Sequence, residues 1–169
     1  KSIGNGYPIS AIIGKKKIMQ VAQETFISST MWTDRLGFIA ANETLKILKK
    51  NNVNKIISSY GNMIKNGWLK ISKKDKIDIT ISGLRTILYL KFNYKNNSEI
   101  LTFFTQEMLK RGYLAGSQVA TTYAYSETII KNYLKEVDQV FSKIKIFIDK
   151  GKFPLKNKVK HSTFKRLTG

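Results

Sequence analysis

The residues best suited to chemistry lie at the start of the chain. Lys1 stands three residues before the turn-forming sequence Gly4-Asn5-Gly6, and a short apolar run at 9–13 follows between a proline and a glycine. Glycines favour tight turns, and a bounded apolar run of this length is typical of a buried strand. A lysine held in a dry site beside such a strand loses its proton near neutral pH, and its amine can then form a Schiff base with an aldehyde. Lys1 is therefore a candidate catalytic residue, although a lysine at a chain end also fits a frayed terminus.

A second group of chemically useful residues is the hydroxyl-rich sequence Ser28-Ser29-Thr30-Met31-Trp32-Thr33. A hydroxyl and nearby backbone N–H groups are good phosphate ligands, because they are neutral donors held in place. Thr30 is the first candidate for such a ligand and Ser29 a weaker one. A threonine buried at the end of a strand is the structural alternative.

These two segments together resemble the class III aminotransferases, which are pyridoxal-phosphate (PLP) enzymes of fold type I. The subgroup that contains glutamate-1-semialdehyde aminomutase is the most similar. Lys1 matches the family's Schiff-base lysine, while Gly4, Gly6 and Pro8 match the turn that follows it. Thr30 matches the threonine that holds the PLP phosphate of the neighbouring subunit.

The resemblance implies an α/β fold that comprises the end of a large domain and a small C-terminal α+β domain. Residues 1–50 would be the C-terminal segment of the PLP-binding large domain, and residues 51–169 the small domain. A PLP site shared between subunits implies a homodimer. The family's aspartate, stacking aromatic residue and glycine-rich loop cannot lie before Lys1 in this sequence. The chain is therefore expected to be the C-terminal part of an enzyme and to be inactive alone.

The implied reaction moves an amino group between small-molecule donors and acceptors, with Lys1 and the cofactor as the reacting groups. The resemblance does not separate intermolecular transfer from the intramolecular transfer of an aminomutase. Many relatives carry a histidine where this chain has Tyr125, and we find no equivalent of the arginine that grips a substrate carboxylate in many members. The substrate class therefore stays open.

Hydrophobic periodicity predicts the elements that would position these residues. A helical turn is expected at 15–20 and a short strand or extended entry at 26–29. A helix that Thr33 caps, with Asp34 in its first turn, is then expected to run to about residue 50, and its apolar face comprises Leu36, Ile39, Ala40, Leu45 and Leu48. The second part reads as α-β-β-α-β-α, a two-layer unit. Its expected elements are a helix at 56–67 closed by Gly67, an extended piece at 68–71, strands at 77–81 and 86–92, a helix at 99–111, an extended piece within 113–122 and a helix at 127–150 that Ser126 caps.

Composition and charge limit the functional classes to which this protein could belong. The formal net charge is +19, yet only four of the 30 basic residues are Arg and the lysines are scattered. Scattered lysines are more typical of solvent-exposed surfaces than of a nucleic-acid-binding site. A small basic nucleic-acid-binding domain and a non-catalytic remnant remain alternatives. The chain has no Cys and one His, His161, so an N/S zinc site is not expected. No apolar run could cross a bilayer and no signal peptide is visible, so a cytoplasmic location is expected.

Overall fold

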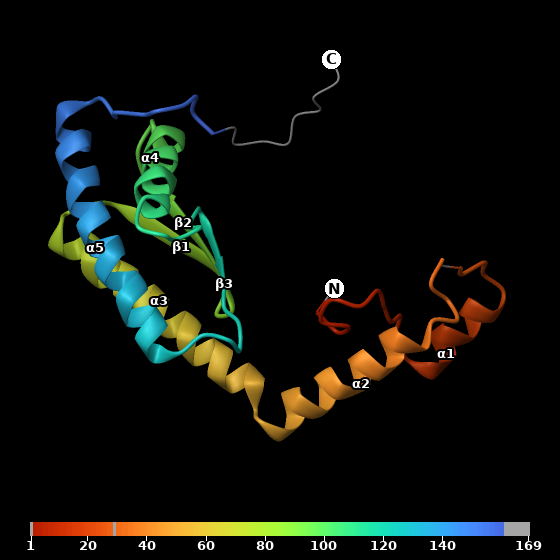
Figure 1. Ribbon diagram of the computed structural model, residues 1–169. Coiled ribbons are helices and arrows are strands. Elements are labelled where there is room, and N and C mark those ends of the chain that lie inside the picture. The colour runs from red at the N-terminus through yellow and green to blue at the C-terminus, as the bar shows by residue number, and fades with distance from the viewer. Residues whose placement is uncertain (1, 29, 161–169) are drawn as a thin grey trace, which may run out of the picture. The chain divides into compact units, whose positions relative to one another are not determined.

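The computed structural model describes residues 2–28 and 30–160, and the chain divides into two compact units, Lys1–Asn54 and Lys55–Gly169 (Figure 1). The sequence-based domain assignment, 1–50 and 51–169, stays a prediction. Lys1, Ser29 and His161 lie outside the described residues.

The first unit contains the short helix α1 (Lys16–Met19), the 3-10 helix η1 (Gln20–Gln23) and the helix α2 (Arg35–Lys50). Both α1 and α2 occur where the sequence predicts them. The predicted N-cap of α2 was one residue early: Asp34 caps the helix, and its side chain accepts a hydrogen bond from the Leu36 backbone N–H at 2.9 Å. A carboxylate also suits the positive end of the helix dipole, which favours Asp34 over Thr33 as the cap.

The predicted buried strand at 9–13 is wrong. These residues form no strand, and the side chains of Ile12 and Ile13 are 67% and 90% exposed. A strand is stable only when a neighbouring strand satisfies its backbone groups, and the sheet of the described residues offers no strand to this segment. The extended entry at 26–28 is likewise exposed at Phe26.

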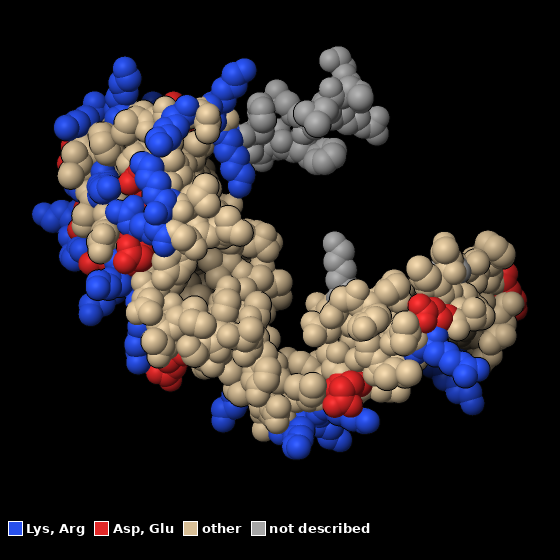
Figure 2. Space-filling model, in the orientation of Figure 1, with Lys and Arg blue, Asp and Glu red and all other residues tan. Residues whose placement is uncertain are grey.

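The predicted apolar face of α2 is not a core face in this unit. Leu36, Ile39 and Leu45 are exposed, whereas the small residues Gly37 and Ala41 are buried. Figure 2 shows that the visible face of this unit is largely uncharged. Exposed large apolar side chains that gather in one region mark a surface that another polypeptide covers in many proteins.

The second unit has the predicted order α-β-β-α-β-α. The elements are α3 (Val53–Lys74), β1 (Ile79–Leu84), β2 (Ile87–Phe92), α4 (Asn97–Leu109), β3 (Gln118–Ala120) and α5 (Glu127–Lys150). The three strands form one antiparallel sheet in the order β1-β2-β3, with Ile81 opposite Leu90 and Leu88 opposite Val119. The two termini of α5 agree with the prediction, and Ser126 caps it by accepting a hydrogen bond from the Ile129 N–H.

The core lies between one face of this sheet and the three helices, so the unit has two layers (Figure 1). Side chains along β2 alternate between the core and solvent. One face of the strand carries the buried residues Leu88, Leu90 and Phe92, and the other carries the exposed residues Tyr89 and Lys91. The largest fully buried side chains come mainly from the helices: Trp68, Phe92, Phe103, Phe104, Phe141, Ile64, Ile100, Met108, Ile130 and Ile144.

The prediction that Gly67 ends its helix, with residues 68–71 extended, is wrong. Helix α3 continues through Gly67 to Lys74, and Trp68 is fully buried. A Cβ atom on Gly67 would lie 2.5 Å from the Leu134 methyl carbons, so this glycine allows α5 to approach α3 closely. The close packing of two helices, and not a turn, therefore explains why a glycine stands at position 67.

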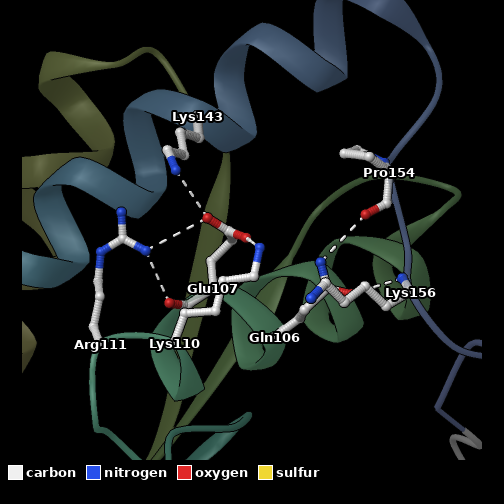
Figure 3. Close-up of polar contacts among 7 residues, drawn as sticks. All are labelled: Gln106, Glu107, Lys110, Arg111, Lys143, Pro154 and Lys156. Carbon is white, nitrogen blue, oxygen red and sulfur yellow. Dashed lines mark hydrogen bonds and ion pairs between the residues drawn. The ribbon is translucent and has the colours of Figure 1, made fainter.

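A polar network joins α4 to α5 around Glu107, which is 3% exposed (Figure 3). Its carboxylate accepts hydrogen bonds from Lys110 and from Lys143, the latter at 2.9 Å, and Arg111 Nη1 lies at 3.4 Å. Arg111 also pairs through Nε with Glu136 at 3.1 Å. The buried carboxylate is thus surrounded by cations from both helices.

The segment after α5 lies along α4 and is held there by one glutamine (Figure 3). The Gln106 side-chain amide donates to the Pro154 carbonyl at 3.2 Å, and its oxygen accepts from the Lys156 backbone N–H at 2.8 Å. Phe153 is buried against the Phe103 ring, with centroids 5.5 Å apart. The segment therefore docks on α4 through hydrogen bonds to its backbone and through the Phe153 ring.

Basic side chains cover much of the second unit. Figure 2 shows Lys and Arg distributed over its visible face with Asp and Glu among them. Several form ion pairs, including Lys74 with Asp138 and Lys145 with Asp149. Among the described residues, no helix is both long enough and apolar enough to cross a membrane.

Candidate cofactor site

The N-terminal turn has a backbone that requires glycine. The Tyr7 N–H donates to the Gly4 carbonyl at 3.1 Å, and a Cβ on Gly4 would lie 2.2 Å from the Tyr7 carbonyl oxygen. Gly6 has a φ of 116°, a region that side chains rarely allow. The expectation that Gly4 and Gly6 shape the turn is confirmed. The turn begins at Ser2, which follows Lys1 in the sequence. Lys1 itself lies outside the described residues.

The hydroxyl-rich segment also forms a turn, at the entry to α2. Thr30 lies in it and its side chain is exposed, and the Asp34 N–H donates to the Met31 carbonyl at 3.2 Å. The alternative of a threonine buried at a strand end is therefore excluded. Ser29, the weaker candidate, lies outside the described residues.

Helix α2 brings these two turns together through a glycine that the sequence analysis did not single out. A Cβ on Gly37 would lie 2.9 Å from the Pro8 carbonyl oxygen and 3.2 Å from Ile9 Cβ, so the helix packs directly on the segment after the N-terminal turn. A glycine within a helix costs about 1 kcal/mol relative to alanine, which is a signal of close packing. That signal was available in the sequence.

A pocket of about 500 Å³ lies where the two segments meet. Its lining comes from the segment after the first turn, from the second turn and from the start of α2: Pro8, Ile9, Ser10, Met31, Trp32, Asp34, Gly37 and Phe38. Trp32 is 60% exposed and therefore presents a large apolar surface beside the pocket. Pro8, Met31 and Trp32 of the two sequence motifs therefore line one cavity, whereas Gly4, Gly6 and Thr30 are not among its lining residues.

One donor suited to an anionic group, Thr30, is the sequence neighbour of the lining residue Met31. Thr30 offers a neutral, exposed hydroxyl next to turn N–H groups, which is the kind of donor that phosphate accepts. The aldehyde would require the amine of Lys1. The Asp34 carboxylate is engaged by the Leu36 N–H, so its acceptor capacity is used in part by the helix. Within residues 2–28 and 30–160, no group of three or more His, Cys, Asp or Glu could hold a metal ion.

Comparison with known proteins gives a consistent set of relatives. The chain is 24% identical over 156 residues to 3-aminobutyryl-CoA aminotransferase of Cloacimonas acidaminovorans (strain Evry), which covers 83% of this chain and 37% of that protein. It is 25% identical over 162 residues to glutamate-1-semialdehyde 2,1-aminomutase of Sulfolobus acidocaldarius, covering 85% and 39%. The chain therefore spans under two fifths of the length of these relatives.

A solved structure shows the same fold. The FumI protein of Sphingopyxis sp. MTA144, in its PLP internal aldimine form, superimposes with a TM-score of 0.77 over 87% of this chain and 36% of that chain, at 21% sequence identity. The predicted α/β fold of the PLP-dependent transferases is confirmed. The family described as Aminotransferase class-III matches residues 1–145. The chain accordingly belongs to the class III aminotransferases, a family whose cofactor is pyridoxal phosphate.

Proposed function

We propose that this chain is the C-terminal part of a PLP-dependent aminotransferase that moves an amino group between small-molecule donors and acceptors. The observation that carries the proposal is the pocket of about 500 Å³, because segments from both sequence motifs line it. The family match over residues 1–145 supplies the reaction class.

In this proposal Lys1 and Thr30 have separate roles. Pyridoxal phosphate, when bound, supplies the aldehyde that accepts amino groups and the ring that withdraws electrons from the substrate carbon. The Lys1 amine binds that aldehyde and later moves a proton at the substrate carbon. The Thr30 hydroxyl, with Ser29 as a weaker second donor, hydrogen-bonds the phosphate and so orients the ring.

The proposal includes further polypeptide, since the chain spans under two fifths of its relatives' length. The exposed apolar side chains of α2, such as Leu36, Phe38 and Ile39, would be covered by it or by a second subunit. We therefore expect this chain alone to be inactive. If Thr30 serves the cofactor of a neighbouring subunit, the active enzyme is at least a dimer.

Two variants of the complete encoded polypeptide, including any sequence before Lys1, test the assignment. Lys1→Ala should abolish transamination while pyridoxal phosphate still binds weakly. Thr30→Ala should weaken cofactor binding about tenfold, as expected for one charge-assisted hydrogen bond. Thr33→Ala is the matched control, because Thr33 is an exposed threonine at the same turn. Near-normal turnover in the Lys1 variant, or equal effects of the two threonine variants, would contradict the assignment.

The second candidate is intramolecular transfer, which the likeness to glutamate-1-semialdehyde 2,1-aminomutase favours. An aminomutase needs no added acceptor, whereas an aminotransferase stops without one. Product formation with and without an added keto acid therefore separates the two reactions.

A further inference from the structure

The second unit contains a pocket that the proposed function does not use. Its volume is about 380 Å³, and it lies among α3, the segment between α4 and β3, and the start of α5. Ile64, Val119, Ile129 and Ile130 contribute to its walls, and no charged residue does. None of its lining residues belongs to the N-terminal segments that carry the predicted cofactor ligands.

One residue that lines this pocket, Tyr133, has a buried hydroxyl with unused donor capacity. Tyr133 lines the pocket, is only 9% exposed, and its hydroxyl oxygen accepts a hydrogen bond from Trp68 Nε1 at 3.2 Å. Its own O–H has no hydrogen-bond acceptor among the described residues. A tyrosine hydroxyl both accepts and donates, so one donor is left over in an apolar setting, where an unmade hydrogen bond is costly.

The protonation state of Tyr133 is secure across the physiological range. Burial raises the pKa of its hydroxyl, and the nearby Tyr125 raises it further, against a smaller lowering by the bond from Trp68. The hydroxyl therefore keeps its proton around neutral pH and can donate a hydrogen bond. Anionic ligands would find this one donor but no cation in the pocket walls, which disfavours their burial.

We propose that this pocket binds a small uncharged molecule that has an apolar body and one hydrogen-bond acceptor, such as an aryl or alkyl ketone. The pocket falls in the size range of small-molecule sites, which combine mostly apolar walls with a few placed polar groups. In the bound state the apolar body contacts the isoleucine and valine walls, and the ligand's carbonyl oxygen accepts a hydrogen bond from the Tyr133 O–H. Leu114, which is 96% exposed, and Ile129, which is 46% exposed, lie at the mouth.

Acetophenone and ethylbenzene are matched probes, since they have similar size and differ by the carbonyl. The chain has two tryptophans, so its indole N–H region has two NMR signals, and Trp32→Phe assigns them. Acetophenone should shift the Trp68 signal saturably, because it polarises the hydroxyl to which that indole donates. It should bind roughly fivefold more tightly than ethylbenzene, the preference expected of one neutral hydrogen bond. Tyr133→Phe should abolish the preference.

A second pair of variants keeps the test decisive if Tyr133→Phe fails to fold. Ile129→Lys places a charge at the mouth and should weaken acetophenone binding, while Ile146→Lys changes a residue of similar exposure elsewhere on α5 and should not. The proposal is overturned by no saturable shift, by equal affinity for the two probes, or by unchanged binding in Ile129→Lys. It is also overturned if the chain binds acetophenone but the complete encoded polypeptide does not, because another protein segment would then occupy the pocket.

Discussion

Glu107→Gln should destabilise the second unit, and it should do so in a pH-dependent way. Burial by itself would raise the pKa of this carboxyl, but the hydrogen bonds from Lys110 and Lys143, together with their charges, lower it to about 2. A carboxyl that binds its proton less readily when folded than when unfolded stabilises the fold in its ionised form. Removing the charge therefore removes that stabilisation.

The magnitude follows from the displacement of the pKa from its ordinary value of 4.5 to about 2. Each pKa unit corresponds to about 1.4 kcal/mol, so the ionised carboxylate contributes at most about 3.5 kcal/mol at neutral pH. The side chains of Lys110 and Lys143 are 46% and 48% exposed, and water can solvate them in the variant. We therefore expect a loss of roughly 1–3 kcal/mol. Because the folded-state pKa is depressed, the contribution is complete above the unfolded value and is lost as the pH falls toward about 2.

Urea denaturation followed by the fluorescence of the buried Trp68, in a Trp32→Phe background, measures this loss. Glu127→Gln is the matched control, since Glu127 pairs with Lys131 but is 65% exposed; it should cost under about 0.5 kcal/mol. The difference between the two variants in lost free energy of unfolding should shrink by more than half between neutral pH and about pH 3. Equal losses in the two variants, or a gap that does not change with pH, would refute the reasoning.

Three further predictions concern packing. Gly67→Ala should destabilise the chain by roughly 1–3 kcal/mol in the same denaturation assay, because the new Cβ would overlap Leu134, whereas a freely exposed helical glycine gains about 1 kcal/mol from this change; an observed gain would contradict the close approach of α3 and α5. Gly37→Ala should weaken cofactor binding in the complete polypeptide more than Thr33→Ala does, by displacing the segment at Pro8, and unchanged binding would disconnect α2 from the site. Gln106→Ala should accelerate tryptic cleavage after Lys156, read by mass spectrometry, and an unchanged cleavage rate would show that the glutamine does not hold the segment.

Local sequence patterns predicted the second unit well, because periodicity and capping residues mark its elements. The alternation of Ile79 and Ile81 with polar residues marked β1, and the apolar stripe of α5 with Ser126 before it marked the longest helix. In each case the residues that form the element also bury it against the same unit. The local pattern and the tertiary packing therefore agree.

The errors occur where packing at a distance decides the structure. Gly67 has the local signature of a helix end, and only the approach of Leu134 explains why the helix continues through it. The run at 9–13 has the signature of a buried strand, but no strand of the described sheet pairs with it. For the candidate site, the family motif indicated Thr30, whereas Gly37 carried only the local signal of a glycine inside a helix, and its contact with Pro8 is visible only in the structure. Lys1 and Ser29 stay predictions.

The docking of the last described segment on α4 has a consequence for how this chain can diverge. The Gln106 side chain hydrogen-bonds main-chain atoms of residues 154 and 156, and the Thr102 hydroxyl accepts a hydrogen bond from the Lys160 backbone N–H at 2.9 Å. Main-chain atoms are the same for almost every amino acid, so the path of the segment is independent of most of its side chains. Its lysines are therefore free to drift, and relatives that keep the glutamine and the buried Phe153 should preserve this path even where the intervening residues no longer align.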